Sequence, residues 1–74
     1  MKKSGSITKI LGRRVRERRL EMGLSQEAFA DKCGIDRTYI SGIERGIRNP
    51  TLVVLYAISE GLNTELSQLF MFSE

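Results

Sequence analysis

The segment that most constrains the fold lies at residues 23–46 and reads Gly-Leu-Ser-Gln-Glu-Ala-Phe-Ala-Asp-Lys-Cys-Gly-Ile-Asp-Arg-Thr-Tyr-Ile-Ser-Gly-Ile-Glu-Arg-Gly. Ser25 is a favourable N-cap, and Gly34 suits the left-handed conformation that ends many helices, so a short helix is predicted over about 26–33. Asp36 can cap a second helix. The segment is therefore predicted to form two short helices joined by a tight turn.

The second of these helices, over about 37–45, has two different faces. Ile40 and Ile43 form a narrow apolar stripe one turn long. The other face carries Arg37, Thr38, Ser41 and Arg45. A helix-turn-helix unit places such a face in the major groove of DNA, where an arginine can donate two hydrogen bonds to guanine. This face is predicted to read bases, with a phosphate contact as the alternative for Arg37.

The chain before this segment predicts one long helix. Apolar residues recur there at helical spacing, which indicates a helix over about 7–22 that ends at Gly23. The recurring residues are Ile7, Leu11, Val15 and Met22. Residues 1–5 are predicted to form a loose tail.

Two further helices are predicted after residue 46, which makes the fold all-α with five helices. Pro50 suits the first turn of a fourth helix, which Asn49 or Thr51 could cap. Its inward stripe is predicted to be Leu52, Leu55, Ile58 and Leu62. Asn63 can take a left-handed stop, after which a short fifth helix is expected. That helix is marked by Leu66, Leu69 and Phe70 or Phe72.

Length and charge indicate one domain, 1–74, with an anionic partner. A chain of 74 residues is near the lower limit for folding on hydrophobic burial alone, so a dimer is expected to add stability. Residues 1–19 hold eight Lys or Arg and one Glu, a balance of +7, whereas the remainder of the chain balances to −4. The first helix is therefore predicted to face phosphates, with Arg16 as a contact; a solvated basic helix is the simpler alternative.

Composition argues against several other classes. The chain has no histidine and no phosphate-cradling glycine loop, so it is not expected to be an enzyme or to use a cofactor or a small-molecule ligand. Cys33 is its one cysteine, and it is predicted to be a small core residue rather than a metal ligand. No apolar run approaches the ~20 residues of a membrane span, and no signal peptide is recognised, so a cytoplasmic protein without a membrane partner is expected.

The stretch from Gly12 to Phe70 resembles the lambda-repressor-like (XRE-type) helix-turn-helix family, with the two helices of residues 23–46 as helices 2 and 3. Within it, Asp36-Arg-Thr-Tyr-Ile-Ser-Gly-Ile-Glu-Arg-Gly-Ile-Arg-Asn-Pro-Thr51 is similar to the controller proteins of restriction-modification systems. The resemblance implies a homodimer on pseudo-palindromic double-stranded operators. For controllers it implies activation at low occupancy and repression at high occupancy, with RNA polymerase as a further candidate partner.

Several residues outside the base-reading row are candidates for the DNA backbone. Gln26 lies in the first turn of its helix, where the positive end of the helix dipole favours a phosphate, although a solvated side chain is the alternative. Tyr39 could bind phosphate through its hydroxyl or shield the preceding helix with its ring. Arg48 and Asn49 resemble the backbone-contacting link of the family. Gly42 suggests a close approach, either to DNA or to the preceding helix.

The resemblance also implies an internal ion pair and a dimer contact. In phage repressors, an arginine of the first helix meets the glutamate near the end of the third, which corresponds here to Arg14 and Glu44, with Arg19 as the fallback. The last two helices carry more apolar surface than one small core can use, so an isologous contact is predicted. Its residues are predicted to be Val53, Val54, Leu66, Leu69 and Phe70.

Two other regulatory proteins use the same fold and remain as alternatives: a phage-type repressor and the antitoxin of a toxin-antitoxin pair. A protein-only adaptor is a third class, but it would leave the outward Arg37 and Arg45 unexplained. Non-specific, salt-sensitive affinity for random DNA would separate a DNA-binding protein from such an adaptor.

Overall fold

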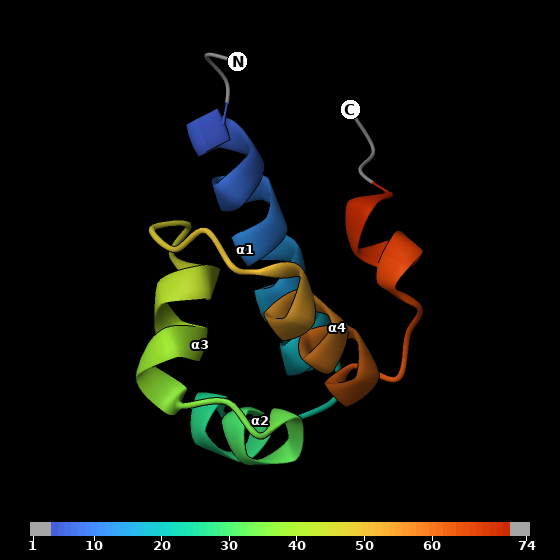
Figure 1. Cartoon of the computed structure of the whole chain (residues 1–74). Coiled ribbons are helices and arrows are strands. Elements are labelled where there is room, and N and C mark those ends of the chain that lie inside the picture. Colours follow the sequence, from blue (N-terminus) through green and yellow to red (C-terminus); the bar gives the residue numbers. More distant parts are fainter. Residues whose placement is uncertain (1–3, 72–74) are drawn as a thin grey trace.

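A computed structural model describes residues 4–71 and consists of four α-helices and one short 3-10 helix (Figure 1). The helices are α1 (Ser4–Glu21), α2 (Gln26–Cys33), α3 (Arg37–Glu44) and α4 (Leu52–Gly61), followed by the 3-10 helix η1 (Leu66–Phe70). No strand occurs in this part of the chain. In Figure 1, α3 and η1 lie on opposite sides of the pair formed by α1 and α4.

The all-α prediction is confirmed, but the count of five α-helices is wrong. The predicted fifth helix is η1, whose five residues fit the tighter 3-10 geometry that proteins use in short pieces. Phe72, named as a possible part of it, lies outside the described residues. α1 begins at Ser4, so Ser4 and Gly5 belong to the helix and not to the predicted tail; residues 1–3 are outside the described range.

Side chains at three helix starts satisfy free backbone N–H groups. Ser25 Oγ accepts from the N–H of Ala28 at 3.0 Å, and Asp36 Oδ2 accepts from the N–H of Thr38 at 2.9 Å, as predicted. Thr51 caps α4. Pro50 therefore precedes the cap and is not in the first turn of α4, because the helix begins at Leu52, two residues later than a proline at the first helical position would indicate.

The first three α-helices end in the same way. Gly23, Gly34 and Gly46 take left-handed conformations with φ between 72° and 77°. In each case the N–H of the next residue donates to the carbonyl five positions earlier, which is the Schellman arrangement. Asn63 takes the same role after α4, with φ 57°, as predicted.

The core lies where α1, α2, α3, α4 and η1 meet. Its most deeply buried side chains are Val15, Phe29, Ile40, Ile43, Ile58 and Leu69. Leu52, predicted to face inward, is instead exposed, and so is Ile7, one of the apolar residues that marked the first helix. Both lie in the first turn of their helices, so the apolar periodicity continues beyond the packed part of each helix.

α1 and α3 touch through their backbones. A Cβ atom added at Gly12 of α1 would lie 2.2 Å from the carbonyl oxygen of Ile43 and 2.7 Å from that of Glu44. Only glycine therefore fits at this crossing.

None of the helices within residues 4–71 is both long enough and apolar enough to cross a membrane.

Candidate nucleic-acid interface

The two faces predicted for α3 are present in the structure. Ile40 and Ile43 are buried in the core, and so is Glu44. On the other face Arg37, Thr38 and Arg45 are exposed and Ser41 is half-buried. The predicted base-reading row is therefore accessible over the whole length of α3.

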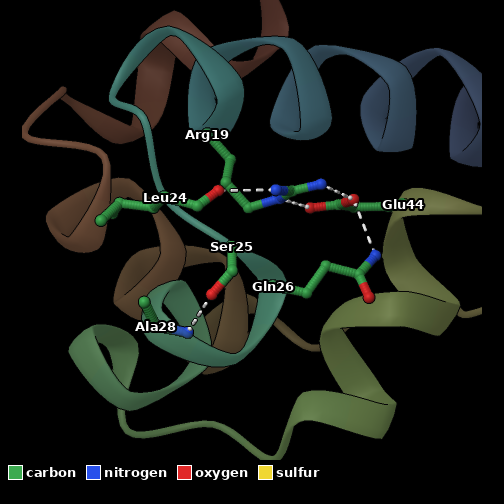
Figure 2. A network of polar contacts seen from close by, with 6 residues as sticks. All are labelled: Arg19, Leu24, Ser25, Gln26, Ala28 and Glu44. Atoms are coloured by element: carbon green, nitrogen blue, oxygen red, sulfur yellow. Dashed lines mark hydrogen bonds and ion pairs between the residues drawn. The ribbon is translucent and has the colours of Figure 1, made fainter.

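A buried polar network joins α1, α2 and α3 on the inner side of the helix-turn-helix unit (Figure 2). The guanidinium of Arg19 donates two hydrogen bonds to the carboxylate of Glu44, from Nε to Oε2 at 2.7 Å and from Nη2 to Oε1 at 2.9 Å. Its Nη1 donates to the carbonyl of Leu24 at 2.7 Å. Hydrogen bonding to Glu44 raises the pKa of Arg19, although burial opposes the shift. The Arg19 guanidinium therefore stays charged inside the fold.

The predicted pairing of Arg14 with Glu44 is wrong, and the fallback, Arg19, is the partner. Arg14 lies five residues earlier on α1, and five residues turn a helix through about 140° relative to a full turn, so the two side chains leave on different faces. Arg14 Nε instead donates to the carbonyl of Gln68 in η1 at 3.0 Å. Arg14 thus links α1 to η1, whereas Arg19 links α1 to α3.

Gln26 joins the same network at the start of α2. Its Nε2 donates to Glu44 Oε1 at 3.0 Å (Figure 2). The first residue of α2 is thus tied to the last residue of α3, which helps to fix the two helices relative to each other. Sequence reasoning missed this contact, because neither helix pattern indicates which side chains meet across the turn.

Tyr39 and Gly42 of α3 form a second cluster with Arg48 of the loop that follows the helix. The guanidinium carbon of Arg48 lies 4.9 Å from the centre of the Tyr39 ring, which is a cation–π contact. A Cβ at Gly42 would lie 2.6 Å from Arg48 Cγ. The close approach at Gly42 is therefore to the stem of Arg48, and not to the preceding helix. The half-buried Tyr39 ring packs against the core and also holds Arg48.

The remaining backbone candidates are accessible. Arg16 and Asn49 are exposed. Lys9 and Arg13 of α1 are exposed as well, so the basic character of the amino-terminal sequence appears on the surface of α1.

The predicted dimer residues divide into three groups. Val53 and Phe70 are exposed, by 78% and 43% of their areas. Val54 and Leu66 are half-buried against the core. Leu69 is only 1% exposed, so its prediction as a dimer contact is wrong: it faces the interior from the one turn of η1 that packs on the core. Three further apolar side chains of the same region are exposed, namely Leu52, Tyr56 and Met71.

Within residues 4–71 we looked for the ligands of a metal site and for a thiol with a lowered pKa. Among residues 4–71, no three His, Cys, Asp or Glu side chains come together as a metal site requires. Cys33 is half-buried and packs closely on Gly61, and burial raises the pKa of its thiol to about 11. Cys33 is therefore a packing residue, as predicted.

Comparison with known proteins agrees with this geometry. The family model described as Helix-turn-helix matches residues 15–69. Control protein C.MunI of Mycoplasma sp is 53% identical over 53 residues, 72% of either chain, and control protein C.BamHI of Bacillus amyloliquefaciens is 39% identical over 71 residues, 95% of this chain and 88% of the relative. The crystal structure of the restriction-modification controller protein C.AhdI from Aeromonas hydrophila matches with a TM-score of 0.85 and 42% identity, over 88% of this chain and 98% of the other. The chain therefore belongs to the helix-turn-helix family of DNA-binding transcription regulators.

Proposed function

We propose that this protein is a controller of restriction-modification gene expression that binds pseudo-palindromic operators as a homodimer. The observation that carries the proposal is the accessible row of hydrogen-bonding side chains on a helix whose other face is locked into the core. Similarity to C.MunI, C.BamHI and C.AhdI supports the controller role.

Base reading is assigned to Arg37, Thr38, Ser41 and Arg45. Arg37 is the first residue of α3 and is exposed, and the N-terminal residues of such a helix meet base edges in the major groove. Its guanidinium can donate two hydrogen bonds to O6 and N7 of guanine. Thr38 can meet a thymine methyl group or a phosphate.

Backbone positioning is assigned to Arg16, Gln26, Tyr39, Arg48 and Asn49. Gln26 sits at the start of α2, where backbone N–H groups favour a phosphate, and its bond to Glu44 limits the positions that its side chain can take. The cation–π contact with Tyr39 likewise holds Arg48 beside the recognition helix. Preorganised donors lose less conformational entropy on binding.

The dimer contact is assigned to Val53, Val54, Leu66 and Phe70, with exposed Leu52, Tyr56 and Met71 around them. An isologous contact between two copies would cover this apolar surface and place the two recognition helices about one DNA turn, roughly 34 Å, apart. Sedimentation should therefore detect a dimer at tens of micromolar, and Val53→Asp should convert it to a folded monomer with a lower thermal midpoint that no longer depends on protein concentration. A stable wild-type monomer would contradict this assignment.

The test of base reading is a set of titrations on the DNA upstream of the protein's own gene, on single-base variants of it and on random DNA. Arg37→Ala should cost ~1–3 kcal/mol on the operator, relax the preference at one base pair and leave random DNA nearly unaffected. Arg16→Ala should weaken both DNAs alike and reduce the salt slope by about one ion. Gln26→Ala should also act on both, with little change in the salt slope because its amide is neutral.

If Arg37→Ala lowered the affinity for all the DNAs equally, Arg37 would be a phosphate contact. Bases would then be read by Thr38, Ser41 and Arg45 or through the shape of the duplex. Absence of any salt-sensitive binding by the wild-type protein would overturn the proposed function itself.

A further inference from the structure

The loop that follows α3 exposes an aliphatic side chain where its capping arrangement would ordinarily cover one. In a Schellman ending, the residue after the left-handed glycine commonly packs on the residue five positions earlier. Leu24 and Ile35, which follow the glycines that end α1 and α2, both pack against the core. Ile47 follows Gly46 in the same arrangement and is 64% exposed.

The exposure of Ile47 has a local cause. The residue five positions before it is Gly42, which has no side chain to pack on. The space beside Gly42 is occupied by the stem of Arg48, whose Cγ lies 2.6 Å from the position that a Cβ would take. Arg48 therefore covers the surface that would otherwise receive Ile47.

The backbone around Ile47 is nevertheless held in place. The N–H of Ile47 donates to the carbonyl of Gly42 at 3.0 Å, and the Oγ1 of Thr8 donates to the carbonyl of Gly46 at 2.9 Å. Lys9 of α1 lies directly against Gly46. An aliphatic side chain is thus presented outward from an ordered loop, at the cost of exposing apolar surface to water.

The surroundings of Ile47 indicate what covers it. Exposed Arg45 and Arg48 flank it in the chain, and the exposed Lys9 packs against the neighbouring Gly46, so the charge around it fits an anionic partner. The loop lies on the α3 side of the molecule, whereas η1 lies on the opposite side (Figure 1). The part of the proposed dimer patch that η1 carries, with Leu66 and Phe70, therefore lies on the other side of the molecule from this loop.

We propose that Ile47 packs against deoxyribose carbons of the DNA backbone, between the phosphates that the neighbouring arginines meet. This inference rests on the proposed function, since it needs α3 in the major groove. A polyanion with apolar sugar edges satisfies both the cationic surroundings and the apolar side chain. Such a contact depends neither on base sequence nor on counterion release.

The test is Ile47→Ala, titrated on the upstream DNA and on random duplex at several salt concentrations. Both affinities should fall by roughly three- to tenfold, as expected when about half of the side chain beyond Cβ leaves water in the complex. The salt slope, the thermal midpoint and the sedimentation behaviour should stay as in the wild-type protein. Ile47→Val should keep most of the affinity.

Two matched variants sharpen the result. Arg48→Ala should weaken binding and also reduce the salt slope, because it removes a charge from the same loop. Leu20→Ala removes another exposed aliphatic side chain, from the carboxyl end of α1, and should leave DNA affinity unchanged.

Three outcomes would overturn the proposal. Unchanged affinity of Ile47→Ala on both DNAs would mean that the side chain touches nothing in the complex. A loss of affinity that occurs only on the operator, and that depends on one base pair of it, would mean that Ile47 contacts a base methyl group. Reduced self-association would make the loop a protein contact. In all three cases the proposed function stands as long as the wild-type protein shows salt-sensitive binding to DNA.

Discussion

The ends of α2 and α3 share a sequence and a backbone arrangement, yet their side chains have different environments. Each helix ends at a left-handed glycine followed by isoleucine, and in each the isoleucine N–H donates at 3.0 Å to the carbonyl five residues back. Ile35 packs in the core because Ala30 and its neighbours offer a buried surface, whereas Ile47 has only Gly42 and the stem of Arg48. Local capping therefore fixes the backbone, and the face of the helix fixes the environment of the side chain.

The largest difference in stability is expected between Glu44 and Lys32, which lie two positions before Gly46 and Gly34. Glu44→Ala leaves Arg19 buried without its partner and should cost about 3–5 kcal/mol of unfolding free energy. The matched change, Lys32→Ala, removes an exposed ammonium that donates to the carbonyl of Gly61 and to Oδ1 of Asn63, so about 1 kcal/mol or less is expected. Urea unfolding of both variants measures this difference. Equal losses of unfolding free energy for the two variants would contradict this prediction. Arg14→Ala should destabilise the protein as little as Lys32→Ala.

The next largest difference in stability is expected between substitutions at Gly34 and Gly46. Gly34→Ala places a side chain at φ 72° in open space, which costs about 1–2 kcal/mol through backbone strain alone. Gly46→Ala carries the same strain and also brings its Cβ to 2.8 Å from the Cα of Lys9, so its loss should be larger by at least about 1 kcal/mol. Thermal unfolding distinguishes them. A loss for Gly46→Ala no larger than for Gly34→Ala would mean that α1 yields easily at Lys9.

The two isoleucines should separate folding from binding. Ile35→Ala removes a partly buried core side chain and should destabilise the fold by about 2 kcal/mol, the lower end of the range for buried aliphatic residues. Ile47→Ala should change the unfolding free energy by no more than about 0.5 kcal/mol, because the side chain is mostly in water. Paired denaturation curves test this. A stability loss at Ile47 as large as at Ile35 would show that the loop is part of the core.

The smallest effect is expected at Cys33, directly before Gly34, and only at high pH. Burial raises the pKa of Cys33 from 9.0 to about 11, so the folded state keeps its thiol proton where the unfolded chain loses it. The stability that this group contributes is complete below pH 9.0 and is lost as the pH rises through about 11. The effect should be small because Cys33 is half-exposed. Stability curves of wild type and Cys33→Ala should therefore diverge above pH 9.0; curves that stay parallel to pH 11 would argue against the shift.

Local signals predicted α2 and α3 to within one residue. Ser25 and Asp36 act within their own turns, and the glycine stops follow from backbone freedom, so no distant contact is needed to place them. The exposed row of α3 followed in the same way from the buried stripe of Ile40 and Ile43.

The errors lie where elements distant in the chain meet. The choice of Arg19 over Arg14 depends on how α1 crosses α3, and the burial of Leu69 depends on which side of a single 3-10 turn packs on the core. The position of Arg48 over Gly42 depends on the path of the loop. Helical periodicity contains none of this information.

The direct backbone contact at Gly12 has a mechanical consequence. Because no side chain separates α1 from the last turn of α3, the two helices cannot slide past each other without an overlap at the carbonyls of Ile43 and Glu44. The basic helix and the recognition helix therefore move as one rigid body. On the two-half-site operator proposed above, a protomer would then have little freedom to adapt to half-sites that differ, and bending and twisting of the duplex would have to absorb the difference.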